Sequence, residues 1–458
     1  MNNAVNEYFH THKGKRIAFC GLGRSNLPLI DMYKKYGAKV IACDKRSFEE
    51  LGEVGVSLEA NGVELSLGSN YLENLDADIL FRTPGMNYNM PELKALRDKG
   101  VEITSEMETF FELCPCKIVA ITGSDGKTTT TTIISELLKA EGKTVHLGGN
   151  IGRPLLPEIF DIKPEDYAVV ELSSFQLISM KKSPDIAVVT NITPNHLDVH
   201  KDMNEYIEAK RNIVSYQNSD CLTILNYNNE ITKSFADNLK SDVRFFNKNA
   251  AGFSSVYRDS DYIYIDNEKI LNIKDIAIPG EHNIENYMAA IGAVWGIVSI
   301  ETINNVAKTF KGVAHRAELV RELNGVKYYN DSIASSPTRT IKGMLSLFEQ
   351  KIILICGGYD KNIPYEPLGP VINNKVKTLI LMGATANKIE KAVISSDNYS
   401  VDNINIITVD TIEKAVKVAS DVAEYGDIVS LSPASASFDM FRDFEHRGNY
   451  FKELVNAL

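Results

Sequence analysis

Short apolar runs that alternate with helical patterns constrain the fold of this chain more than any other feature. The clearest runs are residues 16–21, 39–44, 77–83, 117–123, 167–173, 186–193, 351–358, 377–383 and 427–433. This alternation is typical of parallel sheets covered by helices, so we predict an α/β fold with mostly parallel sheets. Nearly all of the runs end in Gly, Ser, Thr, Asp or Asn. Because ligands of open α/β sheets bind beyond the carboxyl ends of the strands, we expect the chemistry there.

The chain is too long for a single hydrophobic core. Its 458 residues favour about three domains. We place an N-terminal domain at residues 1–105, a central domain at 106–312 and a C-terminal domain at 313–458. Residues 254–266 of the central domain alternate in polarity and predict a small β insertion.

Charge and composition exclude several classes of protein. A formal net charge of −11 with no basic segment argues against a nucleic-acid partner. The first residues lack the apolar centre of a signal peptide, and no apolar run of membrane-spanning length follows. The six cysteines are scattered, and Cys114-Pro115-Cys116 has the wrong spacing for a redox or zinc motif. We therefore expect a cytoplasmic protein with free thiols and no membrane partner.

The segment VAITGSDGKTTTTT, residues 119–132, resembles a shortened phosphate-binding loop. Its glycines allow backbone amides to approach phosphate oxygens, and the helix that follows directs its positive N-terminus to the same place. A solvated lysine in a plain glycine turn is the alternative, but five successive threonines are poor helix formers, so some of their hydroxyls should bind a ligand. We predict a nucleoside triphosphate site formed by Gly123, Ser124, Asp125, Gly126, Lys127, Thr128 and Thr129, with Lys127 on the phosphates and the Thr128 hydroxyl on Mg²⁺.

Further magnesium ligands are expected at the ends of the neighbouring strands. Glu171 directly follows a buried run, where a carboxylate is a hard oxygen ligand for Mg²⁺. The next strand leads to Asn191, His196 and Asp198, of which His196 is our candidate metal or substrate contact. Lys210 lies in a helical pattern, and its spacing does not distinguish a site residue from a surface lysine.

Taken together, these motifs resemble the Mur ligases, ATP-dependent ligases that build the peptide of peptidoglycan. The resemblance covers the whole chain and implies Rossmann-like N- and C-terminal domains around a P-loop ATPase domain. Two segments, ELSSFQL and LSPASASFDMFRDFEHRG, are closest to the members that add D-glutamate. The other matching segments are ITGSDGKTTTTT, GGNIG, NITPNHLD, EAKRNI, GEHNIENYMAA, AHRAE, NDSIASSPTRT and GGYDK.

The resemblance implies a reaction and its participants. ATP would phosphorylate the carboxylate of UDP-N-acetylmuramoyl-L-alanine, and the amine of D-glutamate would displace the phosphate from the acyl phosphate. The implied catalytic residues are Lys127, Glu171, His196, Lys210 and Asn150. Of these, Glu171 would hold the first Mg²⁺ and His196 the second, while Lys210 falls on the lysine that the family carbamylates. A monomer is also expected from the resemblance.

The resemblance also assigns the three substrate sites. Asn283 and Asn286 would contact adenine, with helix capping as their structural alternative. Arg316 and Asp331 would close over the ribose and phosphates. The UDP moiety would bind at Ser25, Asp44, Arg46, Thr83 and Gly85, although a helix cap at Ser25 and a tight turn at 83–85 explain the same residues. The D-glutamate carboxylates would bind at Lys361, Ser437 and Phe444.

One position departs from the family pattern. Where the family commonly has Asp-Ser-Lys-Ala, this chain has Asp331-Ser332-Ile333-Ala334. A cation near the phosphates or the amino-acid site is therefore missing. Lys361, Arg339 and Lys342 are the candidates to replace it, and the sequence leaves the choice between them open.

Other function classes explain less of the chain. A P-loop switch or transport ATPase uses only the central domain. An NAD-dependent oxidoreductase fits the GxG turn at Gly21 and Gly23 with Asp44 about twenty residues on, but gives residues 123–132 no role. Within the ligases, another Mur-type or folylpolyglutamate-type enzyme is the main alternative.

Overall fold

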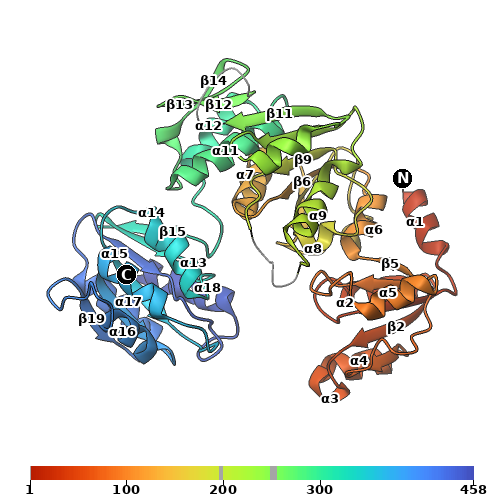
Figure 1. The fold of residues 1–458 in the computed structure, drawn as a ribbon, viewed down its shortest axis with the longest axis horizontal. Helices are drawn as coiled ribbons and strands as arrows, with labels where there is room; N and C mark the ends of the chain where they lie inside the picture. Colours follow the sequence, from red (N-terminus) through yellow and green to blue (C-terminus); the bar gives the residue numbers. More distant parts are fainter. Residues whose placement is uncertain (1, 195–199, 248–254) are drawn as a thin grey trace. The chain divides into compact units, whose positions relative to one another are not determined.

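The computed structural model describes residues 2–194, 200–247 and 255–458, which form two compact units (Figure 1). Unit 1 comprises Met1–Asp275 and His282–Lys308, and unit 2 comprises Ile276–Glu281 and Thr309–Leu458. Unit 1 holds two sheets and unit 2 holds a third. The positions of the predicted domain boundaries, at residues 105 and 312, remain predictions.

The first sheet of unit 1 is entirely parallel. Its order, among the strands described, is β3-β2-β1-β4-β5, so the chain runs outward from β1 in one direction and then in the other. The strands are β1 Arg16–Cys20, β2 Lys39–Asp44, β3 Glu64–Leu67, β4 Ile79–Arg82 and β5 Glu102–Thr104. The helices of this part are α1 Asn2–His10, α2 Leu27–Lys35, α3 Phe48–Leu51, α4 Glu53–Ala60, α5 Pro91–Asp98 and α6 Glu106–Leu113.

The second sheet of unit 1 has the order β14-β13-β12-β11-β10-β9-β6-β8-β7. From β7 to β12 neighbouring strands pair in parallel, and β12, β13 and β14 pair antiparallel, which confirms the β insertion expected at the described residues 255–266. The strands are β6 Lys117–Thr122, β7 Val145–Gly149, β8 Tyr167–Glu171, β9 Ile186–Val189, β10 Leu222–Asn226, β11 Asp242–Asn247, β12 Val256–Arg258, β13 Tyr262–Ile265 and β14 Glu268–Asn272. The helices are α7 Lys127–Ala140, α8 Ser174–Leu177, α9 Met203–Ser215, α10 Glu230–Lys233, α11 Glu281–Val294 and α12 Ile300–Thr309, with short 3₁₀ turns η1 Leu156–Glu158, η2 Ser234–Ala236 and η3 Ile273–Asp275.

The sheet of unit 2 has the order β15-β16-β20-β17-β18-β19 and is parallel except for the β15–β16 pair. Its strands are β15 Glu318–Leu323, β16 Val326–Asn330, β17 Ile352–Gly357, β18 Val376–Met382, β19 Asn405–Thr408 and β20 Ile428–Leu431. Its helices are α13 Pro337–Lys342, α14 Met344–Leu347, α15 Gly369–Lys375, α16 Ala386–Ile394, α17 Ile412–Val422 and α18 Phe444–Ala457, with the 3₁₀ turn η4 Glu366–Leu368.

Burial on both faces explains why the predicted apolar runs became central strands. Every residue of β4, β9, β17 and β20 is buried. Such strands are composed mainly of apolar residues, because helices cover both faces of a parallel sheet; the buried exceptions in these four strands are Arg82 and Ser430. All nine runs form strands, and the predicted α/β fold with mostly parallel sheets is confirmed.

The described helices include none with the length and apolar character that crossing a membrane requires. All six cysteines are free thiols.

Glu106 is a buried carboxyl group in the core of unit 1. It is the first residue of α6, and its Oε1 atom accepts hydrogen bonds of 2.8 Å from the backbone amides of Leu155 and Leu156. Burial raises the pKa of Glu106 from 4.5 to about 7, although these two hydrogen bonds oppose the shift. In the folded protein the protonated carboxyl group of Glu106 is therefore favoured up to about pH 7.

We predict that Glu106→Gln makes unfolding less dependent on pH. A carboxyl group with a raised pKa stabilises the fold fully below about pH 4.5, and this contribution is lost as the pH rises through about 7. The variant should therefore gain about 2 kcal/mol relative to wild type at pH 8 and nothing at pH 5. Calorimetric unfolding at both pH values measures this, and Glu112→Gln, at an exposed position of the same helix, is the control. An equal effect of Glu106→Gln at both pH values would contradict the prediction.

Candidate active site

The loop between β6 and α7 is built on two glycines in conformations that other residues rarely adopt. Gly123 has φ +151° and Gly126 has φ +78°. A Cβ atom at Gly126 would lie 2.5 Å from Oδ1 of Asn286, and one at Gly123 would overlap the Thr190 hydroxyl. The backbone can therefore pass close to its neighbours only without side chains at these two positions. Gly126 is the N-cap of α7, so the loop leads directly to the positive end of a 14-residue helix.

Residues after β9 hold this loop in place. The Ser124 amide donates to the Asn191 carbonyl at 2.7 Å, and the Asp125 amide donates to Oδ1 of Asn191 at 3.0 Å. The Thr190 hydroxyl donates to the Asp125 carbonyl at 2.6 Å, and the Ser124 hydroxyl lies 2.9 Å from the Tyr206 hydroxyl. Strand ends that are distant in sequence thus fix the loop, as expected for adjacent parallel strands.

Glu171 joins the helix of the loop to β7 through its two carboxylate oxygens. Oε2 accepts a hydrogen bond from the Thr128 hydroxyl at 2.7 Å, and Oε1 accepts one from Nδ2 of Asn150 at 2.8 Å. Glu171 is the last residue of β8 and is buried, with 1% of its surface exposed. Hydroxyl and carboxylate oxygens at this spacing are hard ligands that suit Mg²⁺. The three predicted residues Thr128, Glu171 and Asn150 are therefore brought together, in an arrangement that fits the metal.

Lys210 points from α9 to the same loop and is almost completely buried. Its Nζ atom donates to the Gly123 carbonyl at 2.8 Å and to the Thr122 hydroxyl at 3.2 Å. Burial, and secondarily the positive charge of Lys127, lower the pKa of Lys210 well below its ordinary value, although Glu171 opposes this. Lys210 is therefore not the surface lysine that its helical pattern allowed. It is a buried amine beside the loop whose protonation is disfavoured relative to that of a surface lysine.

The remaining predicted residues of the loop lie around the first turn of α7. Nζ of Lys127 donates to the Ser124 carbonyl at 2.9 Å, and Thr129 is half-buried. On α11, Oδ1 of Asn286 accepts from the Thr130 hydroxyl at 3.2 Å and Nδ2 donates to Asn283 at 3.0 Å. Both asparagines thus lie beside the loop in the interior of unit 1. His196 lies outside the described residues.

The GxG turn, Asp44 and Arg46 converge at the carboxyl end of the first sheet. Asp44 accepts from the Leu22 amide at 2.8 Å and from two nitrogens of Arg46 at 2.9 and 2.8 Å. These hydrogen bonds, chiefly those from the Arg46 guanidinium, lower the pKa of Asp44 to about 2, although burial opposes them. Thr83 is adjacent, because a Cβ atom at Gly21 would lie 2.7 Å from its methyl group. Asp44, Arg46 and Thr83 therefore share one site.

Asn26 explains why the turn lacks a third glycine. It is the N-cap of α2, and its amide donates to the carbonyls of Cys20 and Gly21 at 3.0 and 3.2 Å. Asn26 and not Ser25 occupies the N-cap position, but its side chain bonds to the end of β1 and makes no capping hydrogen bond to α2; Ser25 is half-buried in the turn before it. Gly85 follows Thr83 in a turn after β4.

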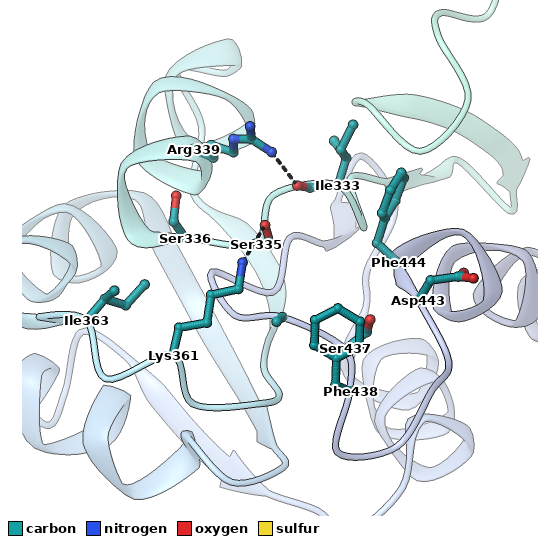
Figure 2. A pocket seen from close by; sticks show the side chains of 11 residues that line it. Ile333, Ser335, Ser336, Arg339, Lys361, Ile363, Ser437, Phe438, Asp443 and Phe444 are labelled. Atoms are coloured by element: carbon teal, nitrogen blue, oxygen red, sulfur yellow. Dashed lines mark hydrogen bonds between the residues drawn. The ribbon is translucent and has the colours of Figure 1, made fainter. Parts of the chain in front are cut away.

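Unit 2 contains a cavity of about 600 Å³ at the carboxyl ends of its strands (Figure 2). The three residues predicted for the amino acid, Lys361, Ser437 and Phe444, all line it. The other lining residues are Ile333, Ser335, Ser336, Arg339, Ile363, Ala436, Phe438 and Asp443. The segments that follow β16, β17 and β20 are thereby brought to one place.

Arg447 forms hydrogen bonds to both the segment after β16 and the segment after β20. This residue was not identified from the sequence. It is fully buried, and its guanidinium donates to the Ser332 hydroxyl and carbonyl and to the carbonyls of Ser435 and Ala436, over 2.9–3.1 Å. Burial lowers the pKa of Arg447 to about 10, so the group stays charged at neutral pH. The sequence signal was weak, because an arginine in a helical, charged stretch ordinarily lies at the surface.

Asp331 follows β16, is buried, and bonds to protein groups. It accepts from the Ser432 hydroxyl at 2.7 Å and from the Ala317 amide at 3.2 Å. Burial raises its pKa to about 7, although these hydrogen bonds and the charges of Arg316 and Arg339 oppose the shift. Arg316 and Asp331 are thus neighbours in unit 2, and their roles toward a nucleotide remain predictions.

Two family profiles match this chain, one over the glycine loop of unit 1 and one over most of unit 2. Residues 121–294 match the Mur ligase middle domain, and residues 315–435 match the Mur ligase glutamate ligase domain. The chain is 52% identical over 465 residues to the UDP-N-acetylmuramoylalanine–D-glutamate ligase of Acetivibrio thermocellus, with 100% of both chains covered. It is 49% identical to the protein of the same name from Clostridium novyi, again over the full length of both.

Solved structures share the fold at low sequence identity. The UDP-N-acetylmuramate–alanine ligase of Thermotoga maritima is similar with a TM-score of 0.59 and 17% identity, covering 97% of this chain and 99% of that one. The MurF ligase of Thermotoga maritima, solved in complex with ADP, has a TM-score of 0.56 and 18% identity, covering 98% and 96%.

We predict that Gly126→Ala impairs nucleotide binding and that Gly142→Ala does not. Gly142 follows the other end of α7 with a similar φ of +80°, but a Cβ atom there meets nothing within 4 Å. Both variants carry the same left-handed strain of roughly 1–2 kcal/mol, whereas only Gly126→Ala also collides with Asn286. Titration with adenylyl imidodiphosphate and Mg²⁺ should show about tenfold weaker binding for Gly126→Ala alone. Equal affinities of the two variants would contradict this account of the loop.

Proposed function

The chain belongs to the Mur ligase family, and on that premise we propose that it joins D-glutamate to UDP-N-acetylmuramoyl-L-alanine at the expense of ATP, a step of peptidoglycan precursor synthesis. The observation that carries this proposal is the full-length similarity, at 49–52% identity, to proteins named for this reaction. The nucleotide-type loop in unit 1 and the cation-lined cavity in unit 2 support it, because the reaction needs both a phosphate donor site and a carboxylate site.

The reaction takes place in two bond exchanges. A carboxylate oxygen of the precursor bonds to the γ-phosphorus of ATP, and the bond from that phosphorus to ADP breaks. The amine nitrogen of D-glutamate then bonds to the acyl carbon, loses a proton, and phosphate leaves with the electron pair of the broken carbon–oxygen bond. The first exchange replaces a poor leaving group by a good one. The difficulty for the protein is to hold several anionic oxygens together, which fixed cations and dipoles can do.

The loop residues supply these cations and dipoles. The first amides of α7, which begins directly after Gly126, would offer their N–H groups to the phosphates, and Lys127 would add a charge at the β- and γ-phosphates. Thr128 and Glu171 would hold the first Mg²⁺, with Asn150 orienting Glu171 through its 2.8 Å hydrogen bond. Bound Mg²⁺ supplies charge neutralisation at the transferred phosphate. His196 and Lys210 are proposed for a second ion.

Lys210 is proposed to act as a carbamate. Carbon dioxide reacts with a neutral amine, forming a nitrogen–carbon bond with loss of a proton, and the product is an anionic oxygen ligand. Two observations support this: the lowered pKa of Lys210 and its position 2.8 Å from the Gly123 carbonyl of the loop. An ammonium group would instead add a positive charge beside the metal ligands.

The substrate contacts follow the clusters in the two units. We propose that Asp44, Arg46 and Thr83, with Ser25 and Gly85, bind the UDP moiety. Asn283 and Asn286 are proposed for adenine, Arg316 and Asp331 for the ribose and phosphates, and Lys361, Ser437 and Phe444 for D-glutamate. We propose that the enzyme acts in the cytoplasm, where ATP is available as its phosphate donor. We also propose, from the resemblance to the Mur ligases, that it is a monomer.

Phosphate release from ATP in the presence of UDP-N-acetylmuramoyl-L-alanine tests the proposed function. We expect turnover with D-glutamate and at least about 100-fold slower turnover with L-glutamate, L-alanine or D-lysine, because an amino acid with the wrong hand or one carboxylate leaves buried polar groups unpaired. Phosphate release that is equal without any amino acid would favour a switch ATPase. Turnover with another amino acid alone would assign the chain to a different ligase.

For Lys210, we expect Lys210→Ala to lose roughly 1,000-fold in kcat, and added acetate or propionate to restore part of the activity by supplying the missing carboxylate. The exposed Lys139→Ala on α7 is the matched control and should resemble wild type with and without these acids. A wild-type intact mass without added carbon dioxide, together with no rescue of the variant, would refute the carbamate.

A further inference from the structure

The cavity of unit 2 carries two positive charges without a carboxylate partner. Lys361 donates to the Ser335 hydroxyl at 3.4 Å, and Nη1 of Arg339 donates to the Ile333 carbonyl at 3.3 Å (Figure 2). Within residues 2–194, 200–247 and 255–458, neither cation forms an ion pair. A pair of such charges in one cavity is suited to a ligand with two carboxylates.

The single acidic residue among those lining the cavity is already engaged. Oδ1 of Asp443 caps α18 by accepting from the His446 amide at 2.7 Å, and Oδ2 accepts from Nε of Arg442 at 2.9 Å. Asp443 therefore does not neutralise Lys361 or Arg339, and in Figure 2 its carboxylate points away from both.

Arg339 is held in surroundings that favour an incoming anion. Partial burial and the positive charge of Arg316 lower the pKa of Arg339, and Asp331 opposes them. Because the pKa of Asp331 itself is raised to about 7, that carboxyl group compensates the guanidinium only in part near neutral pH. A bound carboxylate would relieve the repulsion between the two arginines and accept two parallel hydrogen bonds from the planar guanidinium.

The surroundings also explain why Arg339, and not Lys342, replaces the cation that is absent at position 333. Ile333 contributes an apolar wall and a carbonyl that orients the guanidinium. Lys342 lies three residues further along α13 and does not line the cavity; both side chains are exposed, so the difference between them is their position relative to the cavity. Lys361 and Arg339 come from different segments, after β17 and after β16, so each can hold a separate carboxylate.

We propose that Arg339 is a specificity-determining residue that binds one carboxylate of the incoming amino acid while Lys361 binds the other. The inference rests on the proposed function, because D-glutamate is the dicarboxylate in question. Two anchored carboxylates leave the amine as the free end of the substrate. Arg339 would thus select an amino acid with two carboxylates over one with a single carboxylate.

Steady-state kinetics of Arg339→Met and Lys342→Met test this proposal. We expect Arg339→Met to raise the KM for D-glutamate about 30-fold, with kcat within about threefold and the KM for ATP unchanged, because a charge-assisted hydrogen-bond pair is lost while the apolar stem remains. Lys342→Met should match wild type in all of these constants.

Two analogues with one carboxylate provide a readout that general damage to the fold would not produce. D-2-aminobutyrate lacks the side-chain carboxylate and 4-aminobutyrate lacks the α-carboxylate. Used as inhibitors, one of them should lose affinity for Arg339→Met as D-glutamate does, and the other should bind as to wild type. An unchanged KM for D-glutamate, or equal losses for both analogues, would overturn the role of Arg339. Absence of D-glutamate-dependent turnover in wild type would instead overturn the proposed function, and this inference with it.

Discussion

The buried parallel strand is the constraint on which the arrangement of this protein depends. A strand covered on both faces is mostly apolar along its length, with small hydroxyl residues such as Ser430 and Thr223 as exceptions, so charged side chains are found mainly where the strand leaves the sheet. In unit 1, β6, β8 and β9 are neighbours and end in the glycine loop, Glu171 and the Thr190–Asn191 turn. Parallel direction places these ends at one edge. The phosphate loop, its carboxylate and its supporting hydrogen bonds are therefore consequences of the sheet.

Burial also decides the charge state of the groups next to this edge, and it does so differently in each case. Lys210 donates two hydrogen bonds to neutral oxygens, and burial, followed by the charge of Lys127, lowers its pKa well below the ordinary value although Glu171 opposes the shift. Arg447 is equally buried, yet four hydrogen bonds and the high intrinsic basicity of guanidinium keep it charged. Burial with few partners therefore lowers the basicity of Lys210, whereas the four hydrogen bonds of Arg447 form a permanent structural contact between two loops.

The same contrast between buried and accessible cations is present in unit 2. Arg447 fixes the loops after β16 and β20 from inside, and the cavity above them presents Lys361 and Arg339. Although Ile333 stands where the family commonly has a lysine, the cavity wall still carries a positive charge there, because α13 contributes Arg339 to the same cavity. Cations at different sequence positions can present their charge at the same site, because a ligand interacts with a charge at a point in space and not with a particular position in the sequence.

The sequence by itself determined the α/β class, all nine of the predicted strands, the glycine loop and the family. These features depend on local patterns: apolar runs, turn residues and short motifs. Only the tertiary structure decided which groups meet. Contacts between distant segments or burial explain the bonds of Asn150 and Thr128 to Glu171, the buried state of Lys210, the start of α2 at Asn26, the four hydrogen bonds of Arg447, and the position of Arg339 in the wall of the cavity. The physical reason is that the charge state and the hydrogen-bond partners of a side chain depend on its distances to other groups and on its burial. Both are fixed only when segments distant in the sequence pack together, and local sequence patterns do not reveal them.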